Sequence, residues 1–184
     1  MPQSAFAALP TQAQASLALL SREVEGVIPT EVGAWTIQVA ELPQSTDKPP
    51  VVAEVETWAN KSRVCLYYFE CISPNAELAT VERAFADAKA HEANNRAYPR
   101  LNRQNTCFYV GSSQTVAKRL SEHLGYGAAG TYALQLIHWA QPLQLSLRFV
   151  CAKYSDETPY AIVQALEDAL WEDKQPMFGR QGRK

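Results

Sequence analysis

Arg119 and His123 lie one helical turn apart in the stretch RLSEH, so a permanent cation and an imidazole share one edge of a predicted helix. The buried stripe of that helix is predicted from Val116, Leu120 and Leu124, which recur at helical spacing. Arg119 and His123 fall at the rim of this stripe. A solvated helix flank would give the same pattern, so the pair indicates chemistry only if matching groups occur elsewhere in the chain.

A carboxylate in the last predicted helix has a similar position. Ile162, Val163 and Leu166 predict a buried stripe, and Glu167 lies at its edge. A carboxylate withdrawn from water needs a cation or a hydrogen-bond donor, which Arg119 could supply from the other helix. The alternative is an ordinary surface glutamate whose charged end reaches solvent.

Two tyrosines stand in stretches that resemble strands. Tyr67 belongs to VCLYYFECI, and Tyr109 belongs to TCFYVG. Aromatic and β-branched residues favour strands, and packing within a sheet is the common fate of such tyrosines. Taken alone, they indicate no chemistry.

The composition excludes several classes of protein. With 184 residues, of which 47% are hydrophobic, the chain suits one domain or a domain with an appendage. No stretch approaches the roughly 18 to 20 apolar residues of a membrane span, and the opening MPQSAFAALP lacks the regions of a secretion signal. We therefore expect a soluble, cytoplasmic protein with no membrane partner.

All four cysteines fall in predicted strands, with no close CxxC pair. This placement favours buried free thiols over a zinc site or disulfides. A structural zinc protein built on these residues is the alternative. The four are Cys65, Cys71, Cys107 and Cys151.

The net charge of −2 gives no overall attraction to nucleic acid, but positive charge gathers in two places. The irregular stretch at 94–105 is either a nucleic-acid contact or a solvated loop. The candidate nucleic-acid contacts are Arg96, Arg100, Arg103, Lys118 and Arg180, and the end of the chain also carries Lys174, Arg183 and Lys184.

The first 62 residues predict a mixture of helix and strand and carry no chemical motif. A helix is expected at 11–25, capped by Thr11 and ended by Gly26. AWTIQVA predicts a half-buried strand, ELPQSTDKPP a loop, and VVAEVETW a further strand. We treat residues 1–62 as an N-terminal elaboration of unknown role.

From residue 63 onward, strands and helices alternate. Strands are predicted in VCLYYFECI, at 106–111 and in LQLSLRFVCAKY. A helix capped by Asn75 should run to about Glu92, and the last helix should begin with Thr158 and Pro159 and end near Glu172. We expect an α/β (α+β) fold with a small, mostly antiparallel sheet of three main strands flanked by helices.

LYYF on one strand, YVG on the next, RLSEH on the following helix and a glutamate on a late helix together resemble the GIY-YIG nuclease family. That family includes homing endonucleases, a DNA-repair excision subunit and several restriction enzymes. The resemblance covers about residues 63–182, and YVGSS followed by RLSEH is its most specific part. It implies a nuclease domain over residues 63–184. The matching positions are Tyr67, Tyr109, Gly111, Arg119, His123 and Glu167.

Three features depart from the family pattern. Cys65 and Leu66 replace the usual Gly-Ile, and residues 73–105 form an insertion between the two half-motifs. Many members have an asparagine after the last proline, whereas this chain continues from Pro176 as MFGRQG, with Gln181 as a substitute.

The resemblance implies a metal-dependent endonuclease that hydrolyses DNA phosphodiester bonds. Glu167 would hold a single Mg²⁺ or Mn²⁺, and Arg119 would grip the phosphate through its planar fork. Tyr67 would take the proton of the attacking water, helped by His123, and Tyr109 would orient the water or the phosphate.

A second hypothesis is a catalytically weakened module that binds nucleic acid or a partner protein through the same groove. The sequence leaves open the strandedness of the DNA, the cutting of RNA, and pairing into a homodimer.

Overall fold

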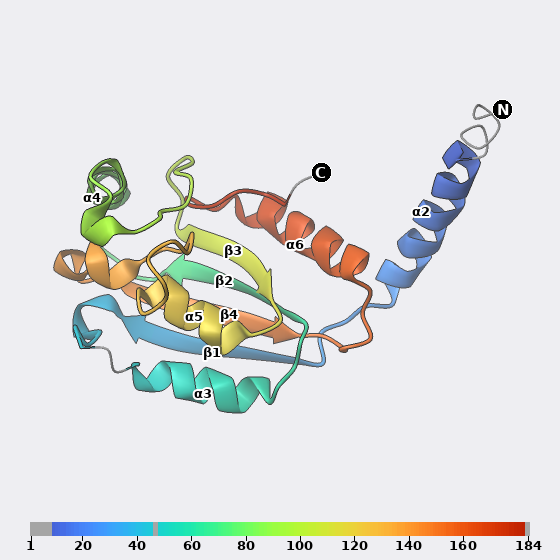
Figure 1. Ribbon diagram of the computed structural model, residues 1–184, viewed down its shortest axis with the longest axis horizontal. Coiled ribbons are helices and arrows are strands. Elements are labelled where there is room, and N and C mark those ends of the chain that lie inside the picture. Colours follow the sequence, from blue (N-terminus) through green and yellow to red (C-terminus); the bar gives the residue numbers. More distant parts are fainter. Residues whose placement is uncertain (1–8, 46–47, 183–184) are drawn as a thin grey trace.

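The computed structural model describes residues 9–45 and 48–182, which form an antiparallel sheet with helices on both faces (Figure 1). The strand order in this described part is β1-β4-β2-β3, so β3 lies at one edge. The α+β class is confirmed, but the sheet has four strands instead of three because β1 pairs along β4. The strands are β1 (Glu31–Gln38), β2 (Cys65–Cys71), β3 (Cys107–Ser113) and β4 (Ser146–Lys153).

Five α-helices occur in the described residues. They are α2 (Leu9–Glu25), α3 (Pro50–Ala59), α4 (Leu78–Ala90), α5 (Val116–Leu124) and α6 (Tyr160–Lys174). Short 3₁₀ turns are Val39–Glu41, Ala93–Asn95, Leu136–His138 and Gln141–Leu143.

The three capping predictions were wrong. Thr11 lies inside α2, which already begins at Leu9. The N-cap positions of α4 and α6 are Glu77 and Pro159. Asn75 and Thr158 instead lie in turns that precede these helices, closed by hydrogen bonds from the backbone N–H of Ala76 to Ser73 and of Thr158 to Ser155.

The strand predicted in VVAEVETW is a helix, α3. Pro50 opens it, and proline is favoured in a first helical turn because no backbone N–H is needed there. Val52, Val55 and Ala59 are buried at spacings of three and four residues, which is the period of a helix. The β-branched valines had favoured a strand, but packing against the core decides the structure here.

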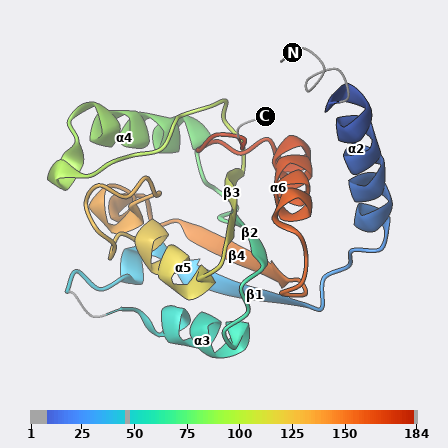
Figure 2. The ribbon, with the colours of Figure 1, turned by 45° about the vertical axis from the view of Figure 1, so that its right-hand side comes forward.

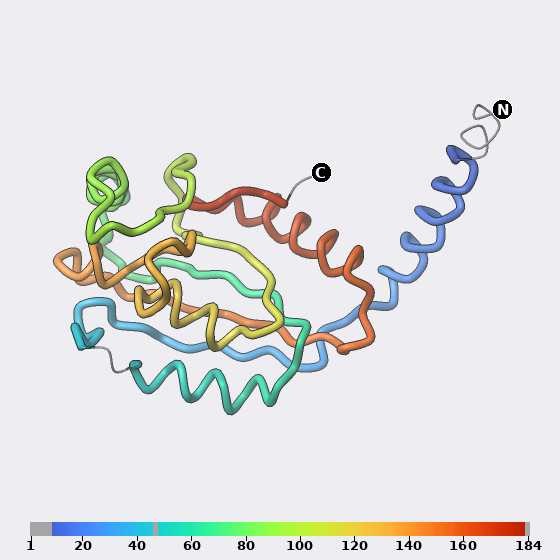
Figure 3. The backbone as a smooth tube through the Cα atoms, in the orientation of Figure 1, coloured from blue at the N-terminus to red at the C-terminus, as the bar shows by residue number. Residues whose placement is uncertain are grey.

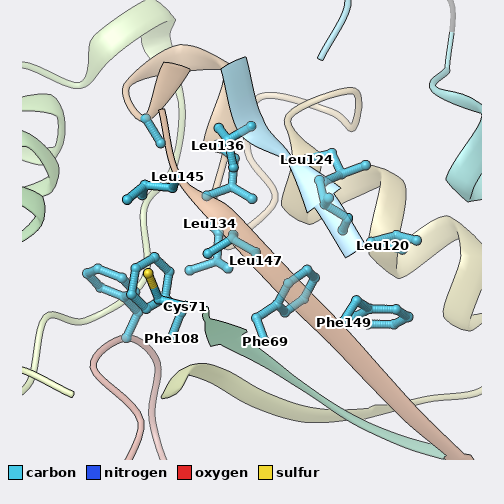
Figure 4. Packing of buried hydrophobic residues seen from close by; sticks show 14 of the residues in the cluster. Phe69, Cys71, Phe108, Leu120, Leu124, Leu134, Leu136, Leu145, Leu147 and Phe149 are labelled. Atoms are coloured by element: carbon cyan, nitrogen blue, oxygen red, sulfur yellow. The ribbon is translucent and has the colours of Figure 1, made fainter. Parts of the chain in front are cut away.

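The larger core fills the space between the sheet and helices α3 and α5. Figure 4 shows leucines of α5 and of residues 134–145 over the phenylalanines of β2, β3 and β4. Phe69 and Phe149 meet at its centre, with ring centroids 4.9 Å apart. A smaller cluster on the other face packs Leu66 against Val163 of α6, so α5 and α6 lie on opposite sides of β3 (Figure 2).

Helix α2 leads away from the sheet, as the tube in Figure 3 shows, and it buries none of its residues. It contacts α6. β1 and α3, by contrast, join the sheet and the larger core. The division of the chain at residue 62 stays a prediction.

All four cysteines are buried and free, as predicted. In the part of the chain that the structure describes, no three His, Cys, Asp or Glu residues cluster as a zinc site would need. None of the described helices is long and apolar enough to cross a membrane.

Candidate active site

Tyr67, Tyr109 and Arg119 converge on the α5 face of the sheet. The Nε of Arg119 donates to the Oη of Tyr67 at 3.2 Å, and its Nη2 donates to the Oη of Tyr109 at 3.3 Å. The two phenol rings are stacked, with centroids 6.3 Å apart and planes 10° apart. They share one face because Tyr67 pairs with Gly111, two residues after Tyr109, and side chains alternate along a strand.

Arg119 is held from several sides. Its Nη1 forms an ion pair with Glu122 at 2.9 Å, and its Nη2 also donates to the carbonyl of Tyr132 at 2.8 Å. The Arg119 side chain keeps 20% of its surface exposed. The guanidinium is therefore fixed in orientation and still reaches the surface, as the rim position predicted.

His123 is fully buried, with 0% of its surface exposed, so the rim prediction was wrong for this residue. The ring packs against Phe69, and the backbone N–H of Leu134 donates to its Nδ1 at 3.2 Å. The residues around Leu134 and Leu136 cover α5 from the outside, which a pattern within the helix alone cannot reveal.

The hydrogen bonds of His123 determine which of its ring nitrogens carries the proton. A nitrogen that accepts from Leu134 carries no proton, so the ring proton of a neutral His123 is on Nε2. Burial, and then the charge of Arg119, hold the pKa of His123 well below its ordinary value, so the ring is neutral. Nε2 lies 3.1 Å from the Oη of Tyr67. His123 therefore donates to Tyr67.

Tyr67 is only 2% exposed, and its Oη accepts from both Arg119 and His123. Burial, followed by the neighbouring Tyr109, raises the pKa of Tyr67 above its ordinary value, and Arg119 opposes this shift. The resting side chain is a neutral phenol. A phenolate at this position would be stabilised by two N–H donors.

Gly111 has no side chain, and the phenol of Tyr67 occupies the space where a Cβ would lie. A Cβ added to Gly111 would lie 2.7 Å from the Oη of Tyr67 and 3.1 Å from Cε1 of Tyr109. Contacts below about 3 Å do not occur for real carbons, so any side chain here would displace the phenol. This is a physical reason for the glycine in YVG.

Glu167 reaches β3 from the opposite side. Gly111 faces Tyr67, so the next residue, Ser112, points toward α6, where its Oγ donates to Glu167 at 2.5 Å. Burial raises the pKa of Glu167, and the hydrogen bond from Ser112 and the charge of Arg119 oppose the shift. Glu167 is thus partly buried and not a fully solvated surface glutamate.

The donor set at Glu167 fits one hard divalent cation. Among residues 9–45 and 48–182, no cationic side chain forms an ion pair with this carboxylate. Mg²⁺ is commonly held by one or two carboxylates, with water and substrate phosphate oxygens filling its other positions. Glu167 offers one such carboxylate, partly buried and close enough to Arg119 for its charge to oppose the rise that burial causes in the carboxyl pKa.

The candidate nucleic-acid contacts separate into two groups. Arg96 donates to the carbonyl of Gly127 at 2.7 Å and to Oε1 of Gln135 at 3.2 Å, so it holds two loops together. Arg100, Arg103, Lys118 and Arg180 are exposed, and two of them, Arg100 and Arg180, line a cavity beside Tyr109.

Gln181, the residue suggested as a substitute for the family's asparagine, is bonded elsewhere: its Nε2 donates to Oε1 of Glu172 at 3.0 Å. The tail is held instead by Asn102, whose Nδ2 donates to the carbonyls of Pro176 at 3.0 Å and Gly179 at 3.1 Å. Sequence reasoning also missed Ser112, although it directly follows YVG.

Comparison with known families gives one result. Residues 97–181 match the model of the GIY-YIG catalytic domain, which confirms the resemblance. The matched segment contains Tyr109, Arg119, His123 and Glu167, whereas Tyr67 lies before it. No curated protein and no solved structure matches this chain.

Proposed function

From the match of residues 97–181 to the GIY-YIG catalytic domain, we propose that this protein is an endonuclease that hydrolyses DNA phosphodiester bonds with one divalent metal ion. The observation that carries the proposal is the position of Arg119. It bonds to both Tyr67 and Tyr109, and its charge acts on Glu167 across the edge strand.

Arg119 would bind the phosphate that is cut. A guanidinium matches phosphate oxygens with parallel N–H donors, and it stabilises the negative charge of the transition state. Because Glu122 and the carbonyl of Tyr132 already hold this side chain, little of its freedom would be lost on binding.

Tyr67 would act as the base, and Tyr109 would orient the water or the phosphate. As the water oxygen bonds to phosphorus, one water proton passes to the ionised Oη of Tyr67, and the bond from phosphorus to the leaving oxygen breaks. His123 would help this step as a hydrogen-bond donor. Its Nε2–H donates to Tyr67, so it would stabilise the phenolate instead of accepting a proton.

Glu167 is the residue that would hold Mg²⁺ or Mn²⁺. When bound, such an ion polarises a phosphate oxygen and stabilises the charge of the leaving oxygen. Ser112 would keep the carboxylate oriented through its hydrogen bond.

A substrate panel tests the proposal. Labelled single-stranded, duplex and branched DNA, together with RNA, are incubated with the protein and Mg²⁺, Mn²⁺ or EDTA. We expect cleavage of DNA with either metal and none with EDTA. Binding without cleavage in every metal-containing reaction would overturn the nuclease assignment.

A further inference from the structure

A cavity of about 540 Å³ opens beside Tyr109. Its walls come from distant parts of the chain: α4, residues 98–100, β3, Tyr132 and the C-terminal tail. The lining residues are Lys89, Tyr98, Pro99, Arg100, Tyr109, Tyr132, Gly179 and Arg180.

The tail forms a fixed wall of this cavity. The N–H of Gly179 donates to the carbonyl of Arg100 at 2.8 Å, and Asn102 holds the carbonyl of Gly179. Gly179 has φ of +108°, and a Cβ there would lie 3.0 Å from Cε2 of Tyr109. Glycine therefore lets the tail pass directly over the Tyr109 ring.

Arg119 joins the cavity to the candidate active site. It donates to the Oη of Tyr109 and to the carbonyl of Tyr132, and both tyrosines line the cavity. A phosphate bound at Arg119 would consequently lie next to the cavity, and the nucleotide attached to that phosphate could enter it.

The charge of the lining suits phosphate. It contains three cations and no carboxylate. Lys89 donates to the carbonyl of Pro99 at 2.8 Å. Arg100 and Arg180 are exposed, and neither forms an ion pair with another residue in the described part of the chain. Their guanidinium groups remain available to phosphate oxygens.

The lining also offers a surface for a base. Tyr132 lines the cavity and is 69% exposed, so its ring is accessible from solvent. Exposed aromatic rings beside a basic groove are the platform on which proteins stack the bases of single strands. A cavity of this size accepts one nucleotide, but a base in a Watson–Crick pair cannot enter it without leaving its partner.

We propose that this cavity binds one unpaired nucleotide next to the phosphate that is cut, with its base on Tyr132 and its outer phosphate between Arg100 and Arg180. The inference rests on the proposed nuclease function. It makes single-stranded or locally unpaired nucleic acid the preferred substrate over fully paired duplex.

Binding in EDTA tests the cavity apart from cleavage. Fluorescence anisotropy measures the affinity for a single-stranded oligonucleotide and for the same sequence as a blunt duplex. Tyr132→Leu should weaken single-strand binding about 5- to 150-fold, the range for one lost stacking contact, and should leave duplex binding unchanged. Arg100→Gln with Arg180→Gln should weaken it further and make the salt dependence shallower.

Matched controls exist for both changes. Tyr160 is 74% exposed but lies at the start of α6, and Arg148 is an exposed arginine on β4. Tyr160→Leu and Arg148→Gln should bind single strands as the wild type does. Equal effects of Tyr132→Leu and Tyr160→Leu, or equal wild-type affinity for single strand and duplex, would overturn the cavity assignment.

Cleavage in Mg²⁺ separates this inference from the proposed function. If the wild type cuts duplex and single strand equally and Tyr132→Leu changes neither rate, the cavity assignment is wrong and the nuclease assignment survives. If Tyr132 is needed for binding but no substrate is cut, the nuclease assignment is wrong and the cavity is a binding site only.

Discussion

The Nε2 of His123 lies 3.1 Å from the Oη of Tyr67, and its other nitrogen accepts the backbone N–H of Leu134. The imidazole is therefore oriented as a donor to the phenol. A histidine beside a tyrosine can either donate a hydrogen bond to the phenol oxygen or accept the phenol proton. Substitutions of His123 can distinguish these two roles.

His123→Gln should retain most of the cleavage rate, because a glutamine amide can still donate a hydrogen bond but cannot take up a proton. His123→Phe lacks a donor and should lose about 10- to 150-fold, the range for a hydrogen bond to a charged group. The deficit should shrink as pH rises and Tyr67 ionises. Single-turnover rates of both variants give the comparison. Equal loss in both would identify His123 as a proton acceptor.

The cleavage rate of the wild type should climb with pH beyond neutrality. Tyr67 has a pKa raised chiefly by burial, so the fraction present as phenolate increases tenfold per pH unit through the ordinary tyrosine value of about 10. Single-turnover cleavage in Mg²⁺ from about pH 7 to 10 measures this slope. A plateau that begins near pH 7 would show that another group acts as the base.

The sequence was sufficient for most strands and helices of the nuclease-like part, because their hydrophobic periods are clear. Tyr67, Tyr109 and Arg119 were grouped only through the family resemblance, and the structure brings these three side chains into hydrogen-bond contact. Glu167 was correctly placed at the edge of a buried stripe. Positions within one strand or helix follow from the spacing of its apolar residues, which the sequence shows directly.

Contacts from loops could not be predicted in the same way. Tyr132 and Leu134 reach α5 from a segment with little regular structure, so no period indicates that it folds back over His123. Arg96 looked like a nucleic-acid contact because it stands in a basic stretch. Its hydrogen bonds to Gly127 and Gln135 depend on the path of a loop about thirty residues later.

Gly111→Ala should reduce cleavage strongly while the protein still folds. The new methyl group would lie 2.7 Å from the Oη of Tyr67, and a shift of about 1 Å in a reacting group can cost on the order of 10²-fold in rate. We expect a moderate loss of stability, about 1 to 3 kcal/mol, from the overpacking.

Gly130→Ala is the matched control, because a Cβ at Gly130 meets no atom within 4 Å. Single-turnover cleavage and thermal unfolding are measured for both variants. A Gly111→Ala protein that cuts as fast as Gly130→Ala would show that the position of Tyr67 is unimportant.

Glu167→Gln should abolish cleavage, with a loss on the order of 10³-fold or more, and should also stabilise the fold at pH 7 in EDTA. Burial raises the pKa of Glu167 in the folded protein above its value in the unfolded chain. The protonated side chain therefore favours the folded state at low pH, and this contribution to stability is lost as pH rises and the buried carboxyl group ionises. At neutral pH the charge therefore costs stability, and the neutral amide removes that cost. The melting temperature of Glu167→Gln should exceed that of the wild type at pH 7, and the difference should shrink as the pH is lowered toward 4.

Asp168→Asn removes a charge from the neighbouring residue and should keep the cleavage activity. Loss of cleavage in both variants, or a lower melting temperature for Glu167→Gln at pH 7, would contradict the assignment of Glu167 as a partly buried carboxylate reserved for a metal ion.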